Sequence, residues 1–267
     1  MRYAYTLPDP AGYAEWSEFE GDVAAIRECG YDAVELQITD PAAFDHARVP
    51  AVLARHGLPF CAFQTGGSYA TRGNCLSTPD AAVRARTRNL LLRFVDLAAR
   101  TGAVMVMGSL QGRLRDEPDR AAGTARIVEA LQEIGDYATR QGATVALEPV
   151  NQLEVGFHNT IAEVEALVRR LDLPGFRMMV DSFHMNIEER GFLEPLARCA
   201  DLLRHVHLVE TNRDVLGAGH CPTAAFVAEL RRLGYQGLCS LGVYTTSHPR
   251  RECMRLCRAE LPARERS

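Results

Sequence analysis

The sequence contains no lysine, and all 30 of its basic residues are arginine. Without a lysine amine the chain cannot form a Schiff base with a substrate or attach pyridoxal phosphate. The lysine of a phosphate-binding loop is missing for the same reason. We attribute the arginine bias to codon composition rather than to thermostability.

Other absences narrow the class of protein. No apolar run approaches the roughly 20 residues that a membrane helix needs, and residues 1–6 lack the long apolar segment of a signal peptide. The net charge of −4 gives no reason to expect a nucleic acid or a membrane as partner. We therefore expect a cytoplasmic protein that acts on a small molecule, and the sequence leaves a homo-oligomer open.

The eight cysteines show no Cys-x-x-Cys spacing and no paired metal-binding knuckles. Cys61 and Cys239 lie in apolar runs typical of strands, where a free cysteine behaves as a small core residue. The sequence therefore predicts free thiols rather than disulfides or a zinc site.

Apolar strand-like runs alternate with helical patterns from one end of the chain to the other. The expected strands are 2–6, 32–37, 58–64, 103–107, 144–148, 176–180, 204–209 and 238–243. The expected helices are 16–29, 41–56, 78–100, 120–140, 160–171, 188–199, 223–233 and 249–256. Gly142 is expected to close the helix over 120–140. Eight strand-then-helix rounds in 267 residues predict an α/β fold, a single (β/α)₈ barrel.

A doubly wound open sheet is the alternative, but no Gly-x-Gly-x-x-Gly follows the first strand. Polar residues also end many strands instead of marking one switch point. No stretch resembles a linker, so we expect one domain over 1–267, with the barrel in 1–258 and a tail in 259–267.

Glu148, Asp181 and His207 end three successive expected strands. The carboxyl ends of barrel strands carry the active site, so these side chains are expected to converge. Each one alone also fits an ordinary ion pair or hydrogen bond at the rim. Two carboxylates and an imidazole together favour a divalent cation such as Mn²⁺, Mg²⁺ or Co²⁺.

More polar residues follow these strand ends or end neighbouring strands. Glu154, His184 and Arg213 lie in the loops, and an arginine beside a metal would hold a hydroxyl, carboxylate or phosphate of a ligand. Glu35 and Gln64 end the second and third expected strands and are candidates to reach the substrate. His184 fits a hydrogen-bonded wall residue equally well, as does His205, one layer deeper than His207.

Four segments resemble the xylose-isomerase-like sugar isomerases and epimerases, above all ketose 3-epimerases of the D-tagatose 3-epimerase type. They are 30–35 (GYDAVE), 147–151 (LEPVN), 181–189 (DSFHMNIEE), and 205–207 (HVH) through Asn212 and Arg213. The run FHMNIEE is the most specific of them. The resemblance covers most of the chain from Gly30 onward.

The resemblance implies that Glu148, Asp181 and His207 are metal ligands, most commonly for Mn²⁺, with Mg²⁺ and Co²⁺ as alternatives. It implies that Glu154, His184 and Arg213 hold the substrate near its carbonyl end. It also makes Glu148 one of two catalytic carboxylates. Apart from the resemblance, His184 is a further catalytic candidate.

The sequence departs from the family pattern at the eighth strand, where Gly242 stands in place of a glutamate that is both metal ligand and second acid/base. Inverting a carbon beside a carbonyl requires a proton to leave one face and another to arrive on the opposite face. Since glycine has no side chain, we expect a glutamate at 242 to fit unless the backbone there has positive φ.

We therefore expect a metal-dependent isomerase or epimerase that acts on a small sugar or polyhydroxy carbonyl compound through an enediolate, in a specialised biosynthetic pathway. A one-base dehydratase similar to inosose dehydratases is the second hypothesis, with His184 protonating the leaving hydroxyl. A silent sugar-binding relative is the third, and a change introduced into the sequence at Gly242 is the fourth. The substrate and its phosphorylation state stay open.

Overall fold

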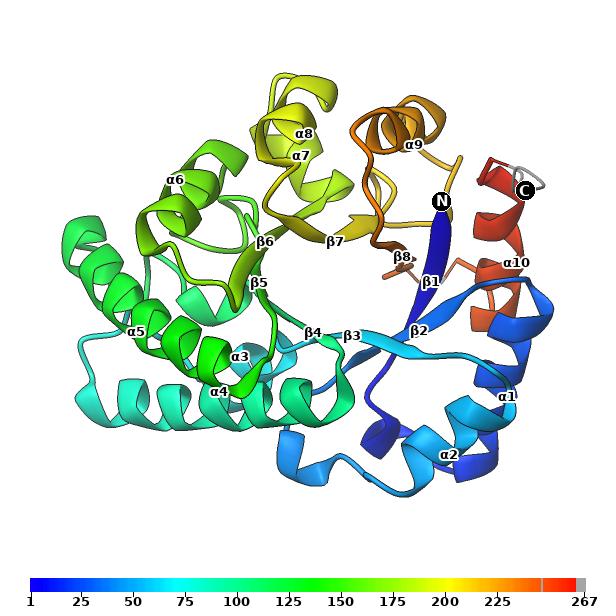
Figure 1. Cartoon of the computed structure of the whole chain (residues 1–267), viewed down its shortest axis with the longest axis horizontal. Helices are drawn as coiled ribbons and strands as arrows, with labels where there is room; N and C mark the ends of the chain where they lie inside the picture. Colours follow the sequence, from blue (N-terminus) through cyan, green and yellow to red (C-terminus); the bar gives the residue numbers. More distant parts are fainter. Residues whose placement is uncertain (246, 263–267) are drawn as a thin grey trace.

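Eight parallel strands close into a barrel in sequential order, with β1 pairing to both β2 and β8 (Figure 1). The structure is a computed structural model, which describes residues 1–245 and 247–262. The strands are β1 Arg2–Leu7, β2 Ala33–Gln37, β3 Phe60–Gln64, β4 Val104–Met107, β5 Val145–Leu147, β6 Phe176–Asp181, β7 Leu203–Leu208 and β8 Leu238–Leu241. The predicted (β/α)₈ barrel is confirmed.

Helices form an outer ring around these strands (Figure 1). The α-helices are α1 Trp16–Glu28, α2 Arg48–Arg55, α3 Gly67–Arg72, α4 Ala81–Thr101, α5 Arg120–Gln141, α6 Ile161–Leu171, α7 Ser182–Glu188, α8 Leu193–Cys199, α9 Thr223–Arg232 and α10 Arg250–Glu260. Three short 3₁₀ helices add Pro10–Gly12, Pro41–Ala43 and Ser109–Gln111. In the described part of the chain, no helix has both the length and the apolar character needed to cross a membrane.

Local capping explains where several helices begin and end. The α4 helix begins at Ala81 after its N-cap Asp80, whose side chain accepts from the amides of Ala82 and Val83, so the start predicted at residue 78 is three residues early. Thr160 and Glu163 form a complete capping box at α6. Gly142 closes α5 with φ of 66°, as its position in the sequence predicts.

Two predicted helices differ in extent from those in the structure. The segment 41–56 forms a 3₁₀ turn and then α2, because the Asp45 side chain accepts from the amides of Ala47 and Arg48 and starts a second helix. Pro50 fits in the first turn of α2, where its missing N–H leaves no bond unmade. The helix predicted over 188–199 is confirmed only for Leu193–Cys199, which form α8. Glu188 instead ends α7, which begins directly at Ser182, and the two helices are separated by a break around Gly191.

Two further predictions concern the thiols and the C-terminus. All eight cysteines are free, as predicted. The α10 helix continues to Glu260, so the boundary expected at 258 falls inside that helix. The expected frayed end, 263–267, lies outside the described residues.

Below the site, the barrel interior combines an apolar cluster with the buried His205. Val106, Ala146 and Met179 form a small buried cluster. One layer toward the carboxyl ends, strand register pairs Asp181 with His207. The fold thus carries the predicted metal ligands on adjacent, hydrogen-bonded strands.

The helical ring is also tied together by buried charge. Glu165 of α6 accepts from Arg169 and from Arg198 of α8. Although burial opposes it, these hydrogen bonds hold the pKa of the Glu165 carboxyl below its ordinary value.

Candidate active site

A cavity of about 250 Å³ opens at the carboxyl ends of the strands. Seven of the eight predicted site residues line it: Gln64, Glu148, Glu154, Asp181, His184, His207 and Arg213. The eighth, Glu35, does not line the cavity and is fully buried. The predicted substrate contact of Glu35 therefore does not match where its side chain lies.

Asp181 has two roles, and the sequence analysis predicted only its place in the site. It is the last residue of β6 and the N-cap of α7, where one carboxylate oxygen accepts from the amide of Phe183 at 2.7 Å. The other oxygen lies 3.4 Å from Nδ1 of His207. Next to it, the Ser182 hydroxyl bonds both backbone groups of Val209 and fixes the end of β6 against β7.

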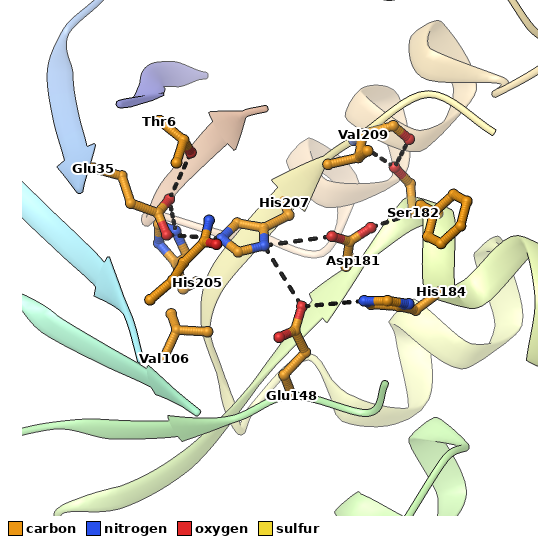
Figure 2. A network of polar contacts seen from close by, with 12 residues as sticks. Thr6, Glu35, Val106, Glu148, Asp181, Ser182, His184, His205, His207 and Val209 are labelled. Atoms are coloured by element: carbon orange, nitrogen blue, oxygen red, sulfur yellow. Dashed lines mark hydrogen bonds and ion pairs between the residues drawn. The ribbon is translucent and has the colours of Figure 1, made fainter. Parts of the chain in front are cut away.

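Glu148 and two histidines surround the same point as Asp181 (Figure 2). One oxygen of Glu148 lies 3.6 Å from Nδ1 of His207 and 3.8 Å from Nε2 of His184. Asn151, a buried residue that the sequence reasoning did not single out, contacts Nδ1 of His184 at 2.7 Å and orients the ring. The structure thus brings His184 to the metal candidates themselves, on the side of Glu148.

Glu35 lies behind His207, on the side away from Asp181 and Glu148 (Figure 2). Its two oxygens contact Nε2 of His205 and Nε2 of His207, each at 2.9 Å. This contact leaves Nδ1 of His207 directed at the cavity carboxylates and keeps the ring fixed. His205 is a buried wall residue, in agreement with its predicted deeper layer.

The electrostatics of this cluster favour an added positive charge. Burial disfavours the imidazolium, but Glu35, Asp181 and Glu148 hold the pKa of His207 well above its ordinary value. Among the described residues, Glu148, Asp181 and His184 place ligand atoms within 4.8 Å of one another. Carboxylate oxygens with imidazole nitrogens suit a hard or borderline divalent cation, which would replace the His207 proton. The donor set therefore fits a divalent metal.

Arg213 reaches the cavity from the loop after β7. Its guanidinium pairs with Glu154 at 2.7 Å and lies 4.0 Å from the ring centroid of Phe183. Its backbone adopts φ of 61°, a conformation that few non-glycine residues take. The ion pair and the ring contact hold this side chain at the cavity wall, where its remaining donors are available to a ligand.

Tyr244 is one of the cavity residues that the sequence reasoning missed. A Cβ atom built on Gly242 would lie 2.9 Å from Cε2 and Oη of Tyr244 and 3.0 Å from Cζ. The backbone at Gly242 does not have positive φ. The expectation that a glutamate fits at 242 therefore holds for the backbone but not for the space as it stands, because the end of the Tyr244 ring would have to shift. Its place two residues beyond Gly242 was the available signal.

Comparisons with known proteins agree with this fold. The model of the family described as xylose isomerase-like TIM barrel matches residues 23–260. A ketose 3-epimerase of Arthrobacter globiformis is 36% identical over 217 residues, which cover 80% of this chain and 74% of that protein.

Two solved structures show the same fold. A D-allulose 3-epimerase from Methylomonas sp., in complex with D-allulose, has a TM-score of 0.79 at 26% identity and covers 92% of this chain and 85% of its own. An L-ribulose 3-epimerase has a TM-score of 0.84 at 25% identity and covers 97% and 93% of the two chains.

Proposed function

The chain belongs to the xylose isomerase-like TIM-barrel family, and from this premise we propose that it is a divalent-metal-dependent sugar epimerase. The proposed substrate is a ketose or a similar polyhydroxy carbonyl compound. The proposed reaction inverts the carbon next to the carbonyl through an enediolate. The ketose 3-epimerase of Arthrobacter globiformis, which this chain resembles over most of its length, supports the substrate class.

The observation that carries the proposal is the convergence of Glu148, Asp181 and His207 on one small cavity. When bound there, a divalent cation would polarise the carbonyl and hydroxyl oxygens of the substrate and stabilise the charge of the enediolate. We assign its binding to these three residues, with Mn²⁺ as the favoured ion.

Glu148 is the proposed base. Its side chain is 13% exposed, so it is shielded from bulk water yet open to the cavity. It would remove the proton from the carbon beside the carbonyl. Nε2 of His184, 3.8 Å from the same carboxylate, is placed to bind the neighbouring substrate hydroxyl. Arg213 and Glu154, together with Gln64, would bind hydroxyls farther from the reacting carbon.

A one-base dehydratase is the second candidate, favoured by Gly242, because the described cavity lacks a carboxylate from β8. In that reaction Glu148 would take the proton and His184 would protonate the leaving hydroxyl. An epimerase returns an isomer of the substrate, whereas a dehydratase releases a product that has lost water. A silent sugar-binding relative would exchange no proton at all.

The test is proton exchange at the carbon next to the carbonyl. Metal-loaded protein is incubated in D₂O with D-allulose or L-ribulose, and deuterium and the 3-epimer are followed by NMR. Wild type should incorporate deuterium and form the epimer, and Glu148→Gln should lose both by roughly 10²-fold or more. Glu229→Gln, on the outer helix α9, is the matched control and should change neither rate. Deuterium uptake that survives in Glu148→Gln would contradict the assigned base.

A further inference from the structure

Epimerisation needs a proton donor on the face opposite Glu148, and the cavity offers few candidates. Asp9 lines it, but its two oxygens accept from the backbone amides of Ala11 and Thr39. Glu154 is paired with Arg213. Histidines and carboxylates of the metal cluster lie on the side of Glu148 itself. Of the titratable side chains among the described lining residues, Tyr244 is left.

Tyr244 stands where a side chain from the end of β8 would be needed. Its hydroxyl lies 2.9 Å from the Cβ position of residue 242. In the closed ring of strands, β8 is three strands away from β5, which carries Glu148. Both side chains line the same cavity, so a substrate between them would expose different faces to them.

The contacts of the Tyr244 hydroxyl suit a donor. The side-chain amide of Gln64 donates to the phenolic oxygen at 3.3 Å, which leaves the phenolic hydrogen free for the cavity. The Arg213 guanidinium lies 5.4 Å from the centroid of the tyrosine ring. After the proton has left, the amide and the cation would both stabilise the phenolate.

We propose that the phenolic hydroxyl of Tyr244 delivers the second proton of the epimerisation, on the face of the enediolate opposite Glu148. This proposal rests on the proposed function. Glu148 takes the proton, and the electron pair of the C–H bond becomes part of the enediolate double bond. The same pair then forms the new C–H bond with the proton of Tyr244, which leaves a phenolate.

The enzyme is reset when the proton on Glu148 returns to the phenolate through cavity water, so atoms and charge balance over the cycle. A tyrosine phenol loses its proton only near pH 10, so the group is protonated and able to donate at neutral pH. A phenol of this kind replaces the carboxylate that Gly242 cannot supply.

The test is Tyr244→Phe, which removes the hydroxyl and keeps the ring on Gly242 and Arg213. With D-allulose in D₂O, the variant should still exchange the proton within about threefold of wild type, because Glu148 is intact. Formation of the epimer should fall by roughly 10²-fold or more. The recovered sugar should carry deuterium with its configuration retained. Tyr137→Phe, which removes a hydroxyl bound to Asp96 on the outer helices, is the matched control.

Three outcomes would overturn the proposal. Unchanged epimer formation in Tyr244→Phe would show that another group gives the proton, and a parallel fall of exchange and epimer formation would show a packing role. Wild type that exchanges no proton with any ketose would overturn the proposed function and this proposal together.

A second pair of variants keeps the test decisive if Tyr244→Phe fails to fold. Tyr244→Ala removes the ring, and adding Gly242→Glu to it restores an acid at the end of β8. The double variant should regain epimer formation at least tenfold over Tyr244→Ala. Equal rates in the two would overturn the proposal that this position supplies the second proton.

Discussion

Replacing Gly242 by glutamate should destabilise the protein, because the ring of Tyr244 occupies the space into which the new side chain would extend. The Cβ alone would lie 2.9–3.0 Å from three atoms of that ring. The rest of the glutamate then needs the same volume, so the ring must leave its place against Arg213. Overpacking of this kind costs about 1–3 kcal/mol. For a domain of this size each kcal/mol lowers Tm by about 2–4 °C, so we expect a fall of roughly 2–12 °C.

Thermal unfolding of metal-free protein measures this change. Gly191→Glu is the matched control: the same substitution in the loop between α7 and α8, where a Cβ would meet nothing within 4 Å. It should leave stability within about 0.5 kcal/mol of wild type. Adding Tyr244→Ala to Gly242→Glu should recover most of the lost stability, since the ring is gone. The reasoning is refuted if Gly242→Glu has the same Tm as Gly191→Glu, or if the Tm of the double variant is no higher than that of Gly242→Glu.

Three further changes test single contacts. Arg213→Ala should lower kcat/KM by roughly 10- to 100-fold, because charge-assisted hydrogen bonds to the substrate are lost, and Tm should stay within a few degrees of wild type. A large fall in Tm would instead show that Arg213 has a structural role. Glu35→Gln takes the carboxylate from both His205 and His207 and leaves one of the two rings without an acceptor. Calorimetry should then show Mn²⁺ affinity reduced about 10- to 100-fold through His207, and unchanged affinity would count against that role. The pKa of Glu165 is lower in the folded protein than the 4.5 of the unfolded chain, so its charge stabilises the fold above pH 4.5, and this contribution is lost as the pH falls through the folded pKa. Urea unfolding should show Glu165→Gln about 1–3 kcal/mol less stable than wild type at pH 7 and equally stable at low pH. A stability difference that does not change with pH would be contrary evidence.

Strand ends were predictable because apolar runs and a polar terminal residue coincide in one short segment. Asp181 and His207 could be placed at one rim from the sequence, since parallel strands of a barrel share their carboxyl ends. Which residues of the cluster face the cavity and which lie behind them was not predictable. Whether Glu35 faces the substrate or the back of His207 depends on the tilt of β2 against β7, and strand order alone does not give that tilt.

Tyr244 shows a different limit of sequence reasoning. The sequence shows that Gly242 has no side chain, but it does not show that the ring of Tyr244, two residues later, fills the space beside it. For a related reason, the start of the helix predicted over 188–199 was misplaced and α7 was missed. Asp181 was read as a site residue only, although the same carboxylate also caps α7 and so starts a helix at Ser182.

The measurement that tests the account most directly is the rate of proton exchange on D-allulose in D₂O, followed while Mn²⁺ is titrated into chelator-treated protein. The account predicts almost no exchange without metal, a rise with added Mn²⁺, and saturation at one ion per chain, because one cluster around Glu148, Asp181 and His207 holds the ion. An exchange rate in chelator equal to that of the metal-loaded protein would contradict the account, as would metal-loaded protein that exchanges no proton.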